Sequence, residues 1–355
     1  DLQSSHFVRE IYENELFPFK ESPSGIPTNI AVLNLAFYPD EKGPYNFDTA
    51  PTAYSSGINQ EGLLNDPESR WGGIMREIMT SDFETANIQY IKFWLMDPFV
   101  EDADHEGGDM YINLGNISED ILRDSRKSFE NGLPTSPSVI NVDTTVWGRV
   151  PTVQAVVNAF DNVPESRIYQ DVGLDGLSND NERSFFDTYL QQLNSIVNQE
   201  VLDEISDDPS NDDFHYFRGS DYDARQLGII ERYKRYNGME GNSPTSEMSE
   251  EPYPTSGSTM PDMEDINRDN TLSETESYYQ YRVSLRPEDM EVGRNYIVDE
   301  IEYTATFANG EQSAVKWYQF KIPVTDYNRS IGNIQDFKSI RFMRMFLRGF
   351  NKDVI

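Results

Sequence analysis

The chain has 355 residues, with 29 Lys plus Arg against 62 Asp plus Glu, which gives a formal net charge of −33. This length suggests about two or three domains and allows a sizeable hydrophobic core. A chain this acidic repels phosphate, which argues against DNA, RNA and anionic lipid as partners. The 12% aromatic content argues against a disordered acidic tail. The lack of Cys excludes disulfides, zinc–thiolate sites and cysteine nucleophiles within these residues.

The start of the chain carries no targeting signal. Asp1 is not followed by a basic segment and an apolar segment, so we expect that any signal peptide has already been removed. No apolar stretch approaches the about 20 residues that a membrane-spanning helix needs. We expect a water-soluble chain that is part of something larger.

The first third of the chain predicts β structure. Residues 29–38, 88–95 and 110–114 are apolar and rich in strand-forming residues, and Gly, Pro, Asn and Asp separate them. Short strands with such breaks are typical of a sandwich or jelly roll. Residues 102–108 form an acidic loop in which we expect His105 to be solvated.

The middle of the chain predicts a helix and then a linker. Between residues 184 and 205, apolar residues recur at steps of three and four, which places them on one helical face. The Asp- and Pro-containing run 207–211 ends this pattern. Residues 242–262 are rich in Ser, Thr, Pro, Glu and Met, which indicates a surface linker.

The last part of the chain predicts β structure again, with strands at residues 278–285, 296–307, 317–324 and 340–350. The fold class expected for the whole chain is mainly β with a helical insertion, built as two modules that resemble β-sandwiches or jelly rolls. We expect an N-terminal β-sandwich module at 1–165, a helical and acidic middle segment with the linker at 166–262, and a C-terminal β module at 263–355.

A weak internal repeat supports two related modules. In each block, a Trp precedes an apolar segment, an Asp-Phe pair follows, and a strand of large residues comes last. The blocks occupy residues 71–95 and 317–347. The alternative interpretation is coincidence among segments that are all rich in β-forming residues.

Residues 265–276 match the spacing of a twelve-residue calcium-binding loop. The candidate ligands are Asp265, Asn267, Asp269, Thr271, Ser273 and Glu276. Position 6 is Asn270 rather than Gly, and Asn tolerates the left-handed conformation that the turn needs. No helix flanks the loop, so a solvated Asp/Asn turn is the alternative interpretation.

Residues 171–182 give a second match to this spacing. The candidate ligands are Asp171, Asp175, Asn179 and Glu182. Gly176 stands at position 6, but Gly173 supplies no side chain at position 3. A helix follows, so acidic capping of its N-terminus is the alternative. Ca²⁺ is therefore the expected cofactor, as a staple that fixes loops and offsets negative charge.

The motifs of common enzymes are absent, and no catalytic residues are predicted. The three histidines are not arranged as a metalloprotease helix motif, and no nucleophile elbow or phosphate-binding loop occurs. With 62 acidic residues, a carboxylate pair for glycoside hydrolysis arises by chance, so a glycosidase has little support. Trp94 and Trp317 lie in strand patterns, where core packing is favoured over a sugar-binding platform.

Longer sequence segments, spread through nearly the whole chain, resemble those of a known protein family. They are LAFYPDEKGPYNFD (35–48), WGGIMREI (71–78), FETANIQYIKFWLMDPF (83–99), GDMYINLGNISEDIL (108–122), YQDVGLDGL (169–177), NDDFHYFRGSDYD (211–223), RYKRYNGMEGNSP (232–244), EDINRDNTLSETESYYQYRV (264–283) and FKSIRFMRMFLRGF (337–350). With them the chain resembles the SprA/Sov family of outer-membrane translocon proteins of the Bacteroidetes type 9 secretion system.

The resemblance implies a protein-export and gliding-motility function and no enzymatic activity. Members of this family form a large β-barrel with soluble insertions, and small subunits gate its openings. The resemblance therefore implies that this chain is a soluble extramembrane portion at the outer membrane. Neither the residues nor the resemblance shows which side it faces, and we favour the extracellular side over the periplasmic one. Its expected partners are the remainder of the barrel, the gating subunits and secreted cargo. The alternative function is a calcium-stabilised carbohydrate-binding jelly roll at the cell surface.

Overall fold

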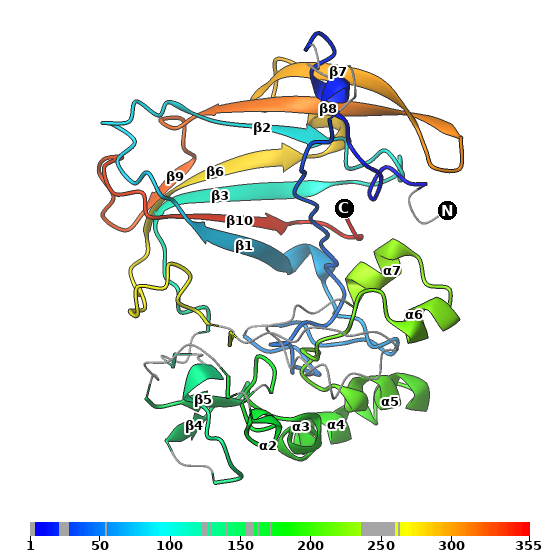
Figure 1. Ribbon diagram of the computed structural model, residues 1–355, viewed down its shortest axis with the longest axis vertical. Coiled ribbons are helices and arrows are strands. Elements are labelled where there is room, and N and C mark those ends of the chain that lie inside the picture. The colour runs from blue at the N-terminus through cyan, green and yellow to red at the C-terminus, as the bar shows by residue number, and fades with distance from the viewer. Residues whose placement is uncertain are drawn as a thin grey trace. The chain divides into compact units, whose positions relative to one another are not determined.

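The fold is described from a computed structural model (Figure 1). The structure describes residues 4–20, 28–53, 55–122, 126–127, 130–138, 141–153, 160–161, 163–170, 172–235, 260–261 and 263–355. The expected linker at 242–262 lies almost entirely outside these residues.

The chain divides into two compact units, and both are discontinuous in sequence. Unit 1 consists of residues 1–39, 67–117 and 276–355, and unit 2 consists of residues 40–66 and 118–275. The structure therefore differs from the expected succession of modules at 1–165, 166–262 and 263–355. Sequence periodicity identifies strands, but it does not show which strands pair, and here strands from both ends of the chain share their sheets.

Unit 1 holds two antiparallel sheets (Figure 1). The five-stranded sheet has the order β1 (Trp71–Glu77), β10 (Phe342–Arg348), β3 (Gly108–Asn116), β6 (Ser277–Leu285) and β9 (Arg329–Ile331). The three-stranded sheet has the order β2 (Tyr90–Met96), β8 (Gln312–Pro323) and β7 (Ile297–Thr306). The unit also contains α1 (Glu13–Leu16) and the 3₁₀ turns η1 (Pro67–Ser69) and η3 (Pro287–Asp289).

The core of unit 1 is shared by the two sheets. Alternate residues of each strand point to one face, so a strand pattern of period two buries one face of each sheet. The buried side chains from both sheets form one cluster, which includes Ile112, Tyr281, Phe320 and Ile322. Because both layers contribute to this cluster, unit 1 is a two-layered β structure.

The other face of β8 is covered by the N-terminal segment. The side chains that pack there are Ile11, Leu16, Val315 and Trp317. The Trp317 indole Nε1 donates a hydrogen bond to Glu15 Oε1 at 2.7 Å, and Arg9 Nη1 donates to Glu15 Oε2 at 2.8 Å. The carboxylate of Glu15 is thus buried with both a hydrogen-bond donor and a counter-charge.

The two repeat blocks are paired with one another inside unit 1. β1 pairs with β10, and β2 pairs with β8, so each block supplies one strand to each sheet. The connections between the sheets also meet, since the backbone N–H of Phe83 donates to the carbonyl of Phe337 at 2.9 Å. The blocks are therefore interlocked halves of one β unit, whereas the sequence predicted two separate modules.

Unit 2 contains a two-stranded sheet, one 3₁₀ turn and several short helices. These elements are η2 (Glu130–Gly132), β4 (Val142–Thr144), β5 (Arg149–Pro151), α2 (Pro164–Arg167), α3 (Asn179–Phe185), α4 (Asp187–Leu193), α5 (Gln199–Asp207), α6 (Ser220–Ala224) and α7 (Ile229–Lys234). The fold class predicted from the sequence, mainly β with a helical insertion, is confirmed by the three sheets and this helical segment.

The helix predicted at residues 184–205 is formed as consecutive short helices. α3 and α4 are separated by Phe186, whose ψ of 17° departs from helical geometry. Asn198 caps the N-terminus of α5, since its side chain accepts a hydrogen bond from the backbone N–H of Val201. The predicted apolar face is nevertheless buried, because Phe186, Tyr189 and Leu193 form the core of this region.

The predicted strands agree with the structure except at residues 29–38. The segments at 88–95, 110–114, 278–285, 296–307, 317–324 and 340–350 correspond to β2, β3, β6, β7, β8 and β10. The segment 29–38 forms only isolated bridges at Asn29 and Phe37, so the prediction of a strand there is wrong. Leu33 is exposed in this segment, and apolar composition alone did not supply a sheet partner.

Candidate metal centre

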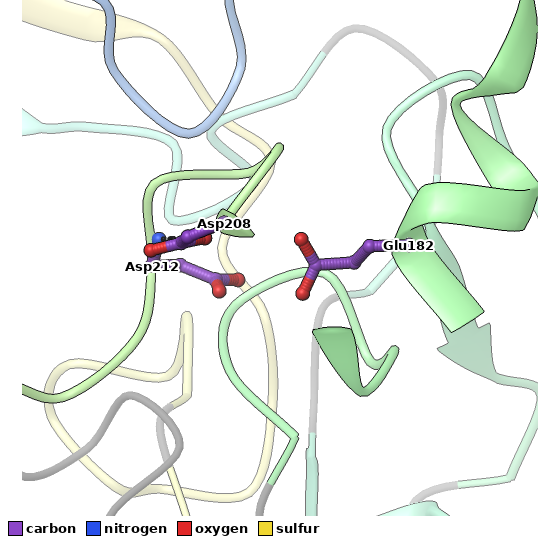
Figure 2. A group of neighbouring side chains, drawn as sticks. All are labelled: Glu182, Asp208 and Asp212. Atoms are coloured by element: carbon purple, nitrogen blue, oxygen red, sulfur yellow. Dashed lines mark hydrogen bonds between the residues drawn. The ribbon is translucent and has the colours of Figure 1, made fainter. Parts of the chain in front are cut away.

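Acidic side chains of unit 2 converge in one cluster (Figure 2). Glu182 extends from α3 on one side, and Asp208 and Asp212 lie in the turn after α5 on the other. One carboxylate oxygen from each residue lies within 4.8 Å of those from the other two. Glu182 and Asp212 are each 1% exposed. Across the described residues, this is the one group of three acidic or histidine side chains that meets so closely.

The turn after α5 is organised by Asp208. Its carboxylate accepts hydrogen bonds from the backbone N–H groups of Asp212 at 3.2 Å and Asp213 at 3.1 Å. Asn211 has a positive φ of 56°, which Asn tolerates better than most residues. These local bonds fix the backbone that carries both Asp208 and Asp212.

Asp212 reaches from this turn to the loop before α3. Its Oδ2 atom accepts hydrogen bonds from the backbone N–H groups of Leu174 at 2.7 Å and Asp175 at 3.1 Å. A Cβ atom at Gly173, whose φ is +76°, would lie 2.5 Å from both carboxylate oxygens of Asp212. The close approach of Asp212 therefore requires glycine at this position.

Ser210 connects the two acidic residues that come from the loop and from α3. Its backbone N–H donates to Glu182 Oε2 at 3.1 Å, and its hydroxyl donates to Asp175 Oδ2 at 2.5 Å. The other oxygen of Asp175 accepts the backbone N–H of Leu177 at 2.8 Å. Asp175 is therefore a buried fourth carboxylate that borders the cluster.

Burial and mutual repulsion shift the protonation of these carboxyls. Burial, followed by the charge of Asp175, raises the pKa of Glu182 to about 8. Burial raises the pKa of Asp175 to about 7. Burial and the neighbouring carboxylates also raise the pKa of Asp212 well above its usual range. A cluster with such shifts is stabilised by protons or by another cation at neutral pH.

Lys42 supplies a positive charge at the edge of the cluster. Burial lowers the pKa of its ammonium group to about 8, although four carboxylates oppose this shift. Its Nζ donates hydrogen bonds to the carbonyl of Pro209 at 2.6 Å and to that of Gly43 at 3.2 Å, and it lies 4.6 Å from the centre of the Phe47 ring. Its hydrogen bonds are thus made to carbonyl oxygens, while its charge acts on four carboxyl groups.

Of the second predicted calcium loop, the structure brings Asp175 and Glu182 together. Asn179 is the first residue of α3, and its amide Nδ2 donates to Asp213 and to the carbonyl of Asp207. Asp171 lies outside the described residues. Asp212 occupies the space next to Gly173, where the twelve-residue pattern has no side chain at position 3.

Asp208 and Asp212 were missed by the sequence reasoning as site residues. In the sequence they belong to the run that ends the helix, and the calcium-loop pattern covers only twelve consecutive residues. The available signal is their density, since residues 207–213 contain Asp207, Asp208, Asp212 and Asp213. Only the fold shows that this run meets the loop before α3.

The first predicted calcium loop is organised around a different carboxylate, that of Glu119. Glu119 Oε1 accepts the backbone N–H of Ile266 at 2.9 Å, and its Oε2 accepts that of Ser273 at 3.0 Å. Asp265 accepts the backbone N–H groups of Asp269 at 3.1 Å and Asn270 at 2.8 Å. Asn270 has a φ of 63°, so the left-handed conformation expected for it is confirmed.

The remaining candidates of this loop make their own polar contacts. Asn267 Nδ2 donates to Asp269 Oδ2 at 3.1 Å, and the hydroxyl of Thr271 donates to Asp269 Oδ1 at 2.5 Å. Glu276 belongs to unit 1, where Arg344 Nη1 and Nη2 donate to its two oxygens at 3.2 and 3.3 Å. Asn267, Asp269 and Thr271 are therefore bonded to one another within the loop, whereas Glu276 is paired outside it.

The expectation that His105 is solvated is wrong, because its side chain is buried and only 3% exposed. Its Nδ1 accepts the backbone N–H of Gly107 at 2.8 Å, and its ring packs near Phe99 and Phe350. Trp317 is buried, in agreement with the expectation of core packing. His105 is therefore part of the core of unit 1.

Unit 1 contains an open pocket of about 610 Å³ with a polar lining that is already paired. Arg282 and Arg286 donate to Asp109 at 2.9 and 2.6 Å, and the hydroxyl of Ser284 donates to Asp289 at 2.5 Å. These groups satisfy one another, so the pocket gives no sign of a ligand.

Comparison with known proteins gives one informative match. The family model SprA_N, described as a motility related/secretion protein, matches residues 188–355. A search of curated proteins finds no match to this chain. None of the helices in the described ranges is both long and apolar enough to cross a membrane. The SprA_N family is a secretion and motility family and not a known enzyme family. The resemblance read from the sequence is thus supported over residues 188–355, where the chain matches the SprA_N motility and secretion family.

Proposed function

We propose that this chain is an extramembrane portion of an outer-membrane protein-export translocon of the type 9 secretion and gliding-motility system. In this role it holds a fixed shape and contacts the remainder of the barrel, the gating subunits and the secreted cargo. The family match over residues 188–355 is the observation that carries the proposal. The interlocked sheets of unit 1 support it, because strands paired over long sequence separations resist local opening.

An in-frame deletion tests this proposal. The region corresponding to residues 1–355 is removed from the full protein in its host, and the remainder is checked for its presence in the outer-membrane fraction. We expect export of the system's cargo and gliding to stop while the remainder is still made. Normal export by a strain with the deletion would contradict the proposal.

We further propose that this portion lies on the extracellular side of the outer membrane. Because these 355 residues contain no Cys, a cysteine introduced here is identified by comparing its labelling with that of the unmodified full protein. Met79 is 85% exposed, so Met79→Cys in the full protein is treated with a membrane-impermeant maleimide. We expect labelling of intact cells. Labelling only after permeabilisation of the outer membrane would place the region in the periplasm instead.

The alternative function, carbohydrate binding by a jelly roll, has weaker support. A sugar platform needs exposed aromatic rings whose faces are free for stacking. Trp71 is 66% exposed on β1, but it meets Phe346 edge-on at an interplanar angle of 70°. Phe346 in turn stacks on Tyr111 at 8°, so these two rings cover each other. We therefore prefer the structural role in export.

A further inference from the structure

We propose that Glu182, Asp208 and Asp212 bind one calcium ion, which joins the loop before α3 to the turn after α5. The proposal concerns the folding of unit 2 and stands independently of the function in export. It relocates the calcium site expected from the sequence, because two of the three ligands lie outside the twelve-residue pattern.

The spacing of the oxygens fits one ion. Calcium is bound by oxygen ligands at about 2.3–2.6 Å, so two ligands of one ion are separated by at most about 5 Å. One oxygen each from Glu182, Asp208 and Asp212 falls within 4.8 Å of the others. All of these donors are carboxylate oxygens, which suit a hard cation and disfavour zinc or copper.

An unpartnered buried oxygen points to a missing ligand. Asp212 Oδ1 is buried and has no hydrogen-bond partner, while Oδ2 of the same carboxylate accepts two backbone N–H groups. A buried acceptor without a partner is costly, and natural structures contain few of them. Figure 2 shows the carboxylates of Asp212 and Glu182 pointing toward one another, an arrangement that repels unless a proton or another cation lies between them.

Backbone hydrogen bonds hold the ligands in place. Each of the three carboxylates accepts at least one backbone N–H, from Ser210 to Glu182, from Asp213 to Asp208 and from Leu174 to Asp212. Such bonds orient a carboxylate and leave it lone pairs for a metal ion. The site is therefore preorganised by local structure rather than by flexible surface side chains.

Charge balance favours the same conclusion. Glu182, Asp208, Asp212 and the neighbouring Asp175 face the ammonium group of Lys42, whose nitrogen donates to two carbonyl oxygens. The guanidinium of Arg149 acts on Asp175. A divalent cation would offset most of the remaining negative charge in a region that is poorly solvated. Lys42 then acts as a fixed repulsive charge that limits the affinity for calcium.

The direct test is calcium binding by the full 355-residue chain. The protein is prepared in chelator, transferred to chelator-free buffer and titrated with calcium chloride by calorimetry, and its melting temperature is measured with and without calcium. We expect one ion per chain and a rise of about 5–10 °C when calcium exceeds its Kd about 100-fold. Absence of both binding heat and a melting shift would overturn the proposal.

Two matched carboxylate-to-amide variants localise the ion. Asp212→Asn keeps the shape of the side chain and should lower calcium affinity by more than the roughly 10-fold typical of losing an outer-shell partner. Asp265→Asn, in the other predicted loop, should leave the affinity unchanged, since Asp265 is also buried and bonded to its own loop. Calcium binding that Asp265→Asn abolishes and Asp212→Asn preserves would refute the assignment.

Two further measurements keep the test decisive if a variant is poorly folded. In chelator, Asp212→Asn should melt no lower than the unmodified chain, because it removes a buried like charge. Lys42→Gln should raise calcium affinity severalfold, since it removes a nearby positive charge. A lower affinity in Lys42→Gln, with its fold intact by circular dichroism, would contradict a cation at this position.

Discussion

At the scale of single residues, Gly173 is the position on which the acidic cluster depends most directly. The carboxylate oxygens of Asp212 lie 2.5 Å from where a Cβ atom of residue 173 would stand. In the sequence, glycine at this place counts against a calcium loop, because it offers no ligand. In the fold, the missing side chain admits a carboxylate from a distant part of the chain.

We predict that Gly173→Ala destabilises unit 2 more than a glycine substitution in open space does. The new Cβ would lie 2.5 Å from two oxygens of Asp212, so Asp212 or the backbone must move at a cost of about 1–3 kcal/mol in the free energy of unfolding. The positive φ adds about 1–2 kcal/mol of strain. Urea unfolding followed by circular dichroism measures the sum.

The matched control is Gly310→Ala. Gly310 also has a positive φ, of +86°, but a Cβ atom there meets nothing within 4 Å. This variant should show only the strain of the left-handed backbone, about 1–2 kcal/mol. Equal losses in the two variants would mean that the contact with Asp212 carries no energetic weight.

At the scale of elements, the sequence predicted the strands better than their pairing. Alternation in residues 317–324 predicts β8, and from Tyr318 onward every second side chain is buried. No local pattern shows that β8 pairs with β2, since the paired residues Phe93 and Phe320 are far apart in sequence. The failure at residues 29–38 has the same cause, because a β-forming sequence needs a neighbouring strand to become one.

The sequence predicted those residues of the acidic cluster that lie close together in the chain. Asp175 and Glu182 lie within one twelve-residue pattern, and the spacing found both. Asp208 and Asp212 follow α5, so their approach depends on how α3, α4 and α5 fold back on one another. Tertiary structure, rather than any motif, therefore completes the cluster.

We predict that the cap of α5 contributes measurably to unit 2. The side chain of Asn198 accepts the backbone N–H of Val201 at 3.0 Å, so Asn198→Ala should reduce the free energy of unfolding by about 0.5–2 kcal/mol. The control is Ser178→Ala at the start of α3, where the side chain makes no such cap bond. Chemical denaturation compares the two, and a larger loss for Ser178→Ala would contradict the assignment.

At the scale of the whole molecule, the region that matches the family model is not a structural unit. Residues 188–355 contain β6 to β10, but β10 lies between β1 and β3, which come from earlier in the chain. β8 likewise lies between β7 and β2. A fragment limited to the matched region would leave both edges of β10 and one edge of β8 unpaired, and it would lack the core side chains of β2 and β3.

We therefore predict that residues 188–355 alone do not fold, and that coexpressed residues 1–187 rescue them. The fragment of residues 188–355 lacks β1, β2 and β3. In it, β10 loses both of its hydrogen-bonded neighbours, and β8 loses β2. Solubility and a cooperative thermal transition are the measurements, with the full chain as the reference. A sharp transition from the fragment alone would contradict the interlocked fold.

The acidic cluster also sets how the stability of the calcium-free chain depends on pH. A carboxyl whose pKa is raised by folding holds its proton after the unfolded chain has released it. The folded state then binds more protons between the two pKa values, so stability falls as pH rises through that window. For Asp175 and Glu182 the window runs from the usual values near 4 to about 7 and about 8.

We predict that in chelator the melting temperature falls steadily from about pH 5 to about pH 8, because each tenfold change in proton affinity is worth about 1.4 kcal/mol. Saturating calcium should flatten this slope, since the ion replaces the protons. Glu182→Gln should also flatten it in chelator, whereas Glu288→Gln on the surface of unit 1 should not. A melting temperature that rises with pH in chelator would show that these carboxylates are already balanced within the fold.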